Sequence, residues 1–500
     1  MAFIFAGLGH VRPDDWARFM EEETGERSSP LAADQCERGA GDARMRLCAI
    51  GREATIRDLS LPDADLVAAG SGALEGDRDV APAVLDAYRL AGVSGLAGLR
   101  GEYAFALWDG RERSLLVGCD AVGLRAPAYV WDGQTFLASS RATALLRFAQ
   151  ARRGWDRVYL ADALSGLSCR TAAATAFAGV RRMMGGEILR VSRGGVERLA
   201  GDRLVFDAGA WQDREGAARE LGGRLDRVVR AKADVRRSCV ALSGGVDSCA
   251  VASSMARHSS VLDAFALVGP DGSPAEPSTL SSMTSAIAGL RLHRVPLPAD
   301  ITAPLDSKPL TDDPIWAGPG LQAGRVAILR AARGLGFERI FDGEGGDELF
   351  DLAWRPADMA REFALAPVLS ALRHRGAARR MARDLVMGGS LGPLSDVWLR
   401  RVKRQVRERR SWLLPDFWRS PELGDAWRES RSFGVLRSAR ERLPEILGAH
   451  ASHWRNQSLA RRSAGLDGAS PLLDRSVVEL VGSLPAHLAM DPLHRKALLR

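Results

Sequence analysis

The stretch Cys239-Val240-Ala241-Leu242-Ser243-Gly244-Gly245-Val246-Asp247-Ser248 decides the fold of the C-terminal part of this 500-residue chain. Its first four residues are apolar and predict a buried strand, and a helix is predicted from Ser248 to Arg257. Gly244 and Gly245 carry no Cβ, so the backbone can approach a phosphate closely at this turn. The free N–H groups at the start of a helix, together with its dipole, bind anions. The stretch therefore predicts a phosphate-binding turn between a strand and a helix.

The polar side chains of this turn point to ATP and Mg²⁺. The hydroxyls of Ser243 and Ser248 are hydrogen-bond donors, and Asp247 supplies a carboxylate for the magnesium ion that neutralises phosphate charge. The turn is not a Walker P-loop, because it lacks the pattern G-x-x-x-x-G-K-[ST] and no lysine lies nearby. It resembles the pyrophosphate loop of the N-type ATP pyrophosphatases.

Predicted strands and helices alternate on both sides of the turn. Helices are expected at residues 214–232, 278–289 and 322–334, and strands at 262–268, 292–295 and 339–341. This alternation predicts an α/β fold, in which a parallel sheet carries helices on both faces. Ligands of such folds bind at the carboxyl ends of the strands.

A second Gly-rich turn follows the strand expected at 339–341, with the sequence Asp342-Gly343-Glu344-Gly345-Gly346-Asp347-Glu348. Crowded carboxylates repel one another, so a cation or a shared proton is expected among them. If Asp347 lies opposite Asp247, the two carboxylates form a magnesium site.

A third element lies near the end of the chain, where Ser470-Pro471-Leu472-Leu473-Asp474 is followed by Arg495-Lys496-Ala497-Leu498-Leu499-Arg500. The chain has 69 lysine and arginine residues, yet lysine occurs only at positions 232, 308, 403 and 496. A lysine in such a chain suggests a need for a compact ammonium group with a tunable proton. Lys496 is therefore a candidate catalytic residue.

Residues 1–205 have a different pattern, with short apolar runs separated by Gly and Asp turns. Examples are Glu102–Trp108, Ser114–Gly118 and Glu187–Val191. Their close spacing predicts antiparallel layers, with a helix near Val80–Leu90. We therefore expect two domains, residues 1–205 and 206–500, with a helical part at 351–470 that is rich in Arg and Trp.

The overall composition excludes several classes of protein. Six cysteines without a C-x-x-C pair exclude a zinc site of that type and a disulfide scaffold. No apolar run reaches the ~20 residues of a membrane helix, and no signal sequence precedes the first expected strand. The net charge of +7 includes a dense Arg stretch at 400–410, but no interleaved aromatic residues indicate nucleic-acid binding. We expect a cytoplasmic protein that binds neither membrane nor nucleic acid.

The two Gly turns and the Lys496 segment, in this order, resemble the asparagine synthetase family. The resemblance extends into the N-terminal part at Leu99–Asp109 and Asp120–Gly123. It implies a degenerate glutaminase-like (Ntn, class II amidotransferase) β-sandwich followed by an ATP pyrophosphatase domain. It also implies catalytic roles for Lys496 and Glu344 and a magnesium site at Asp247 and Asp347. The nucleotide-binding residues that it implies are Leu242, Ser243, Gly244, Gly245, Asp247, Ser248, Leu267 and Gly343.

The chain departs from this family in two places. Active glutaminases of the family use an N-terminal cysteine, but position 2 is Ala2, so the amine is expected from another source. The chain also ends four residues after Lys496, where family members usually continue through further helices. Two branches without the cysteine form rings from an amine of the substrate itself, namely the β-lactam synthetases and the lasso-peptide macrolactam synthetases.

Two features favour the lasso-peptide branch. β-Lactam synthetases have a tyrosine in the second Gly turn, where this chain has Glu344, and the segment Trp412–Trp418 is similar to that of the cyclases. The leading hypothesis is that ATP adenylates an Asp or Glu side chain of a precursor peptide and the peptide's own N-terminal amine attacks it. A leader peptidase or leader-binding protein is the expected partner. The alternatives are an ammonia-dependent asparagine synthetase or another carboxylate amidator, a β-lactam synthetase-like enzyme, and a catalytically dead scaffold.

Overall fold

A computed structural model describes residues 3–8, 33–38, 45–50, 54–75, 78–148, 154–160, 173–269, 280–298, 319–362 and 438–499, with short gaps in several of these ranges. Four features of the sequence analysis lie outside the described residues, wholly or in part. They are Ala2, the Arg stretch 400–410, the Trp-containing segment 412–418 and five residues of the helix expected at 278–289.

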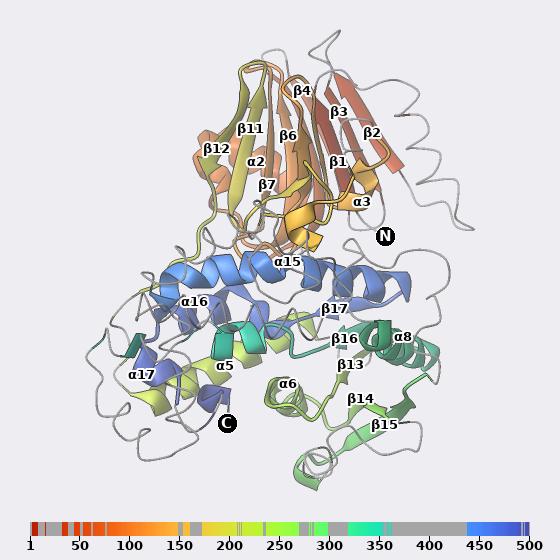
Figure 1. Ribbon diagram of the computed structural model, residues 1–500, viewed down its shortest axis with the longest axis vertical. Coiled ribbons are helices and arrows are strands. Elements are labelled where there is room, and N and C mark those ends of the chain that lie inside the picture. Colours follow the sequence, from red (N-terminus) through yellow and green to blue (C-terminus); the bar gives the residue numbers. More distant parts are fainter. Residues whose placement is uncertain are drawn as a thin grey trace, which may run out of the picture.

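The described N-terminal residues form two six-stranded sheets, and every pairing within them is antiparallel. The expected antiparallel layers are therefore confirmed (Figure 1). The first sheet contains β1 (Phe3–Leu8), β2 (Ala33–Arg38), β3 (Met45–Ile50), β8 (Ala128–Trp131), β9 (Phe136–Ser139) and β10 (Arg181–Arg182). The second contains β4 (Ala54–Leu61), β5 (Ala64–Leu74), β6 (Gly101–Asp109), β7 (Ser114–Cys119), β11 (Glu187–Ser192) and β12 (Gly195–Ala200).

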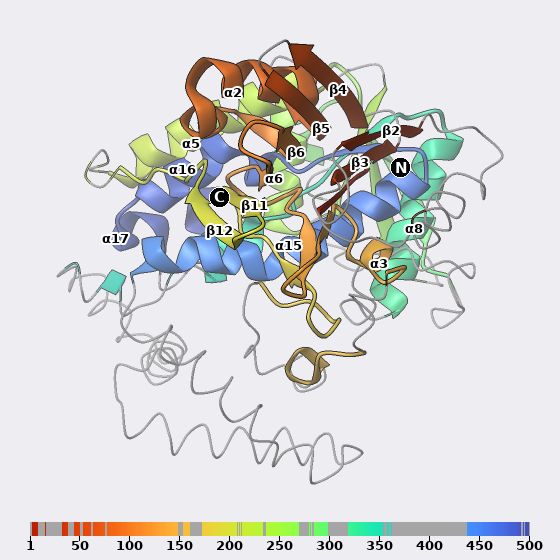
Figure 2. The same cartoon turned by 90° about the horizontal axis from the view of Figure 1, so that it is seen from above.

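Alternation along β6 explains why these sheets pack as a sandwich. Ala104, Ala106 and Trp108 are buried between the two sheets, while Tyr103 and Phe105 are buried against α2 (Val80–Leu96) on the other face. Successive side chains of a strand point to opposite faces, so β6 is buried on both. Figure 2 shows α2 on the outer side of β5 and β6. A short helix, α3 (Ala142–Leu145), packs on the outer face of the first sheet.

The C-terminal part contains a five-stranded sheet with the order β15-β14-β13-β16-β17, and all its pairings are parallel. Its strands are β13 (Ser238–Ala241), β14 (Leu262–Val268), β15 (Leu290–Pro296), β16 (Arg339–Phe341) and β17 (Asp467–Ala469). The strand order reverses between β13 and β16, which makes that point the expected ligand-binding position of an open α/β sheet. Both Gly-rich turns follow these two strands.

Helices cover both faces of the parallel sheet, as expected. Val240 of β13 and Phe341 of β16 belong to the core shared with α5 (Arg214–Lys232) and α6 (Val246–Ala256). Their neighbours Cys239 and Ile340 pack on the opposite face with α8 (Pro319–Gly334). Because the strands are covered on both sides, their residues form apolar runs in the sequence.

Two expectations about the helices and strands need correction. β17 lies within the part expected to be helical, residues 351–470. Its three residues, Asp-Gly-Ala, have little strand propensity, so their pairing with β16 decides the conformation. α2 extends to Leu96 instead of ending near Leu90, across a break at Ala91 and Gly92, where φ of the glycine is positive.

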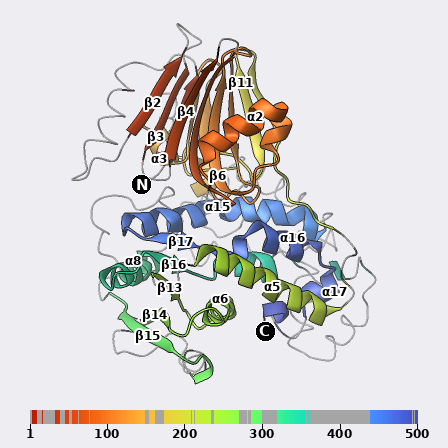
Figure 3. The same ribbon diagram turned by 180° about the vertical axis from the view of Figure 1, so that it is seen from behind.

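A long helix, α15 (Ala439–Ser463), lies between the β-sandwich and the parallel sheet (Figures 1 and 3). Arg455 of α15 donates to the Ala126 carbonyl of the sandwich, and Lys232 of α5 pairs with Glu102 of β6. The chain after α15 forms β17, η4 (Pro471–Leu473), α16 (Arg475–Ser483), α17 (Ala486–Ala489) and η5 (Ala497–Leu499). None of the described helices is long and apolar enough for a membrane span.

Candidate active site

The first Gly turn, residues 243–245, connects β13 to α6 with a tightly bonded backbone. Gly244 has φ +86°, a region that favours glycine, and Gly245 is the N-cap residue of α6. The Ser248 hydroxyl donates to the Gly245 carbonyl at 3.1 Å and lies 3.1 Å from the Ser243 hydroxyl. Because no side chain caps α6, its first N–H groups remain suited to an anion. α6 begins at Val246 and not at Ser248, so Asp247 lies in its first turn.

The second Gly turn packs directly against the first. A Cβ on Gly343 would lie 2.6 Å from the backbone nitrogen of Ser248, and a Cβ on Gly346 would overlap the carboxyl carbon of Asp247. The two turns therefore need glycine at positions 343 and 346 to approach each other.

Gly346→Ala is expected to push Asp247 out of place. Overpacking of this kind costs about 1–3 kcal/mol, and we expect ATP–pyrophosphate exchange to fall at least about tenfold. Gly222→Ala is the matched control, because a Cβ there meets nothing within 4 Å and alanine favours the helix α5. Equal exchange activity of the two variants would show that the turns need not pack this closely.

Lys496 joins the two turns. Its ammonium group pairs with Oδ2 of Asp247 and lies 2.7 Å from Oδ1 of Asp347. Burial lowers the pKa of Lys496, but its bonds to the two carboxylates outweigh this and raise the pKa above its usual value. The structure thus brings together the three residues that the sequence analysis singled out from three separate segments.

Asp247 and Asp347 fit a magnesium ion that also binds phosphate. Oδ1 of Asp247 is buried without a hydrogen-bond partner, and a cation, the Lys496 ammonium, already lies between the two carboxylates. Burial raises the pKa of Asp247, and Lys496 opposes this effect. No cluster of three or more His, Cys, Asp or Glu side chains among the described residues could hold a metal by itself. Mg²⁺ commonly uses one or two carboxylates together with substrate phosphates, so Asp247 and Asp347 would hold it.

Both turns border a cavity of about 580 Å³. One of its walls is apolar and comes from β13, β14, β16 and α8, with side chains suited to an adenine ring. Leu242 and Leu267, expected near the base, both line the cavity together with Ile328, Leu329 and Ile340. Of the other expected site residues, Ser243, Asp247, Ser248, Gly343, Glu344 and Asp347 also line it. Gly244, Gly245 and Lys496 do not.

A second wall is polar, and none of its residues on α15 and α8 was predicted from the sequence. α15 contributes His450, His453, Gln457 and Arg461, and α8 contributes Arg325. The four α15 residues are spaced by three, four and four positions, so they share one face of the helix. The pattern H-x-x-H-x-x-x-Q-x-x-x-R is visible in the sequence. The position of this pattern next to the Gly turns cannot be seen in the sequence, because only the fold places α15 beside the two turns.

Glu344 is the centre of this polar wall. Its Oε1 accepts from Arg325 at 2.9 Å, and its Oε2 lies 2.5 Å from Nε2 of His453. Burial raises the pKa of Glu344, but His453 and Arg325 outweigh it and hold the pKa below its usual value. Asp342, at the start of the same turn, pairs with Arg461 and accepts from the Ser470 hydroxyl at 2.8 Å.

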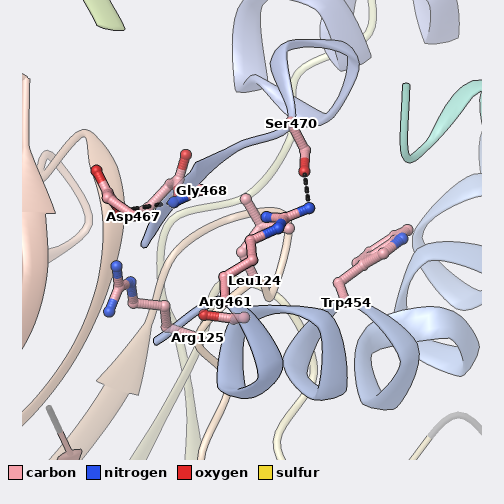
Figure 4. A pocket seen from close by; sticks show the side chains of 9 residues that line it. Leu124, Arg125, Trp454, Arg461, Asp467, Gly468 and Ser470 are labelled. Atoms are coloured by element: carbon pink, nitrogen blue, oxygen red, sulfur yellow. Dashed lines mark hydrogen bonds between the residues drawn. The ribbon is translucent and has the colours of Figure 1, made fainter. Parts of the chain in front are cut away.

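A second, much smaller cavity of about 40 Å³ lies between the sandwich and α15 (Figure 4). It is lined by charged residues that include Glu102, Arg125 and Asp467. Arg461 lines both cavities and donates to the Ser470 hydroxyl at 3.4 Å. Burial raises the pKa of Glu102, but Lys232 and Arg125 outweigh it and hold the pKa at about 2. The small cavity is therefore lined by charged side chains, and one of them, Arg461, also lines the large cavity.

Both parts of the chain match known protein families. Residues 220–500 match the protein family Asparagine synthase, and residues 72–200 match the Glutamine amidotransferase domain. The Amidase chyE of Penicillium rubens is 27% identical over 296 residues, which are 53% of this chain and 42% of that protein. Asparagine synthetase [glutamine-hydrolyzing] 3 of Bacillus subtilis is 27% identical over 162 residues, which are 32% of this chain and 26% of that protein. The chain thus spans less than half the length of these curated relatives.

Among solved structures, the glutamine phosphoribosylpyrophosphate amidotransferase of B. subtilis complexed with ADP and GMP is 10% identical. The similarity covers 68% of this chain and 80% of that one, with a TM-score of 0.28, which is too low to carry an argument. Since the family match covers more than half of the residues, this chain belongs to the asparagine synthase family.

Proposed function

We propose that this protein activates a carboxylate with ATP and joins the activated acyl group to an amine, releasing AMP and pyrophosphate. The observation that carries the proposal is the meeting of Asp247, Asp347 and Lys496 beside the phosphate-binding turn. Family membership supports the same reaction class.

In this proposal, different site residues bind ATP and stabilise negative charge. The turn with Ser243 and Ser248 binds the pyrophosphate end of ATP, and the apolar wall with Leu242 and Leu267 holds adenine. When bound, Mg²⁺ neutralises phosphate charge. Lys496 stabilises negative charge on the phosphate or on the tetrahedral oxyanion, an electrostatic effect that is strong in a site shielded from water.

For the finer function we favour macrolactam formation in a lasso-peptide precursor. An Asp or Glu side chain becomes the adenylate, and the N-terminal amine of the same peptide attacks it, so the peptide supplies both reacting groups. Ala2 argues against a glutaminase nucleophile. Cys119 of β7 is also unsuited to be a glutaminase nucleophile, because its thiol is buried, donates to the Met184 carbonyl and has a pKa raised well above the usual value.

The proposal includes a domain arrangement and partners. The proposal assigns residues 1–205 to a degenerate glutaminase-like domain and residues 206–500 to the ligase domain. The family matches at 72–200 and 220–500 support a division between these two parts. A precursor peptide is the substrate, and a leader peptidase or leader-binding protein is the partner. An ammonia-dependent asparagine synthetase or related carboxylate amidator is the second candidate, favoured by the similarity to the B. subtilis synthetase. A β-lactam synthetase-like activity is less favoured, because Glu344 replaces tyrosine.

Carboxylate-dependent ATP–pyrophosphate exchange tests this function. We expect exchange with synthetic linear peptides that have a free N-terminal amine and one Asp or Glu downstream at varied spacing. Mass spectrometry should then show a product lighter than its peptide by one water. Exchange with free aspartate and none with any peptide would replace this proposal by the amidator. Labelled glutamate released from glutamine during turnover would also contradict it.

A further inference from the structure

Glu344 and His453 form a close pair inside the polar wall of the large cavity. Nε2 of His453 lies 2.5 Å from Oε2 of Glu344, and their side chains are 7% and 18% exposed. Glu344 comes from the turn after β16, whereas His453 comes from α15, 109 positions later in the chain. Arg325 of α8 donates to the other carboxylate oxygen at 2.9 Å. Three separate elements therefore fix the position of one carboxylate.

This pair differs from the other acidic groups of the cavity. Asp247 and Asp347 are engaged with Lys496, and Asp342 with Arg461 and Ser470. His450 lies 3.8 Å from Glu348, which is too long for a hydrogen bond. Glu344 remains ionised through its partners, and a carboxylate with two bonds still has free lone pairs. Histidine is the side chain that changes protonation most readily near neutral pH.

Resting on the proposed ligase activity, we propose that His453 is a positioning residue that acts through Glu344 to take the proton from the attacking amine. Glu344 is the group that faces the amine and accepts its proton, and the Nε2–H of His453 donates to Oε2 and fixes the position of that carboxylate. The ligand that this subsite receives is an alkyl amine presented next to the acyl adenylate.

The step balances without any further reactant. The uncharged amine nitrogen forms a bond to the acyl carbon, and the bond from that carbon to the AMP oxygen breaks, with the electron pair leaving on AMP. The proton lost by the nitrogen moves to the Glu344 carboxylate. The Nε2–H of His453 donates to Oε2 throughout the step, because an ionised carboxylate can only accept.

The surroundings of the pair contain charges of both signs. Arg325 approaches Glu344 from α8, and Gln457 lies near Arg325, one turn beyond His453 on α15. The charge of Glu348, in η3 (Glu348–Leu352), also interacts with that of Glu344. The other charged or titratable groups of the cavity are Asp247, Asp342, Asp347, His450 and Arg461.

His453→Gln should separate activation from amide formation. With a peptide of the kind described above, we expect amide formation to fall at least about 10²-fold, the usual contribution of a positioned acid–base group. ATP–pyrophosphate exchange should stay within about threefold of the unmodified protein, because exchange precedes the attack of the amine. The acidic limb of the pH profile for amide formation should move to higher pH, since loss of His453 removes a group that lowers the pKa of Glu344, which must be ionised to accept the proton.

Hydroxylamine provides the readout that a purely structural role would not change. It is uncharged and nucleophilic at neutral pH, so it attacks an acyl adenylate without help from a base. His453→Gln should therefore form hydroxamate at nearly the unmodified rate while amide formation is lost. His487→Gln on α17, outside the cavity, is the control and should retain both reactions.

A double-mutant cycle with Glu344→Gln completes the test. If the two residues act as one unit, the double variant should be no slower in amide formation than the slower single variant. Independent, multiplying losses would overturn the proposal, as would parallel losses of exchange, hydroxamate and amide. Normal amide formation by His453→Gln would do the same. Failure of the proposed ligase function is distinct, because the unmodified protein would then give no carboxylate-dependent exchange.

Discussion

Replacement of Asp247 by asparagine is expected to lower ATP–pyrophosphate exchange by at least about 10³-fold. Asparagine keeps the size of the side chain, which packs against Gly343 and Gly346 of the second turn, but removes its charge. Two carboxylates are available to a magnesium ion here, and loss of one removes half of its protein ligands. Groups that only support metal ligands already contribute 10–100-fold, so a direct ligand should contribute more. The loss should occur with every carboxylate substrate.

The control for this variant is Asp213→Asn. Asp213 caps α5 by accepting from the Gly216 N–H at 2.6 Å, and asparagine caps helices about equally well. It should leave exchange unchanged. A titration of Mg²⁺ distinguishes the causes, because Asp247→Asn should need much more Mg²⁺ for half-maximal exchange. Normal exchange at the usual Mg²⁺ concentration would remove Asp247 from the metal site.

Lys496→Ala is expected to lower amide formation by about 10³-fold while ATP affinity falls much less. The ammonium group is 2.7 Å from Asp347 and pairs with Asp247. In the proposed reaction, this position places it near the charge that develops on phosphate and on the tetrahedral oxyanion. Loss of one oxyanion donor commonly costs about 10²–10³ in rate, and a full charge in a site shielded from water should cost at least as much. Single-turnover measurement of amide formation, beside nucleotide-binding titration, separates the two effects.

Lys496→Arg tests whether a compact charge is required. A guanidinium spreads its charge over a planar fork and cannot occupy the same space between Asp247 and Asp347. We expect this variant to fail nearly as severely as alanine. Nucleotide binding should first be verified for both variants, because Lys496 also ties the end of the chain to the first turn. Amide formation at the unmodified rate by Lys496→Ala would show that the lysine has no catalytic role.

The amino-acid sequence determined the local chemistry of this protein. The apolar run before Ser243 and the glycines after it predicted β13, its turn and the following helix, because strand burial and turn conformation depend on near neighbours. Arg214–Lys232 and Leu262–Val268 were predicted with the bounds that α5 and β14 have. The parallel sheet followed from the alternation of these elements. The sequence also singled out Asp247, Asp347 and Lys496 as candidate site residues, since they occur in unusual local settings.

The tertiary structure alone decided which of these side chains meet. Lys496 reaches Asp247 across 249 positions of sequence, and His453 reaches Glu344 across 109. No local pattern encodes such pairings, because they depend on how α15 and the end of the chain pack on the sheet. β17 shows the same principle for secondary structure, since Asp467–Ala469 become a strand only by pairing with β16. Residue type and near neighbours thus fix the turns and the chemistry, whereas packing between distant segments fixes the site.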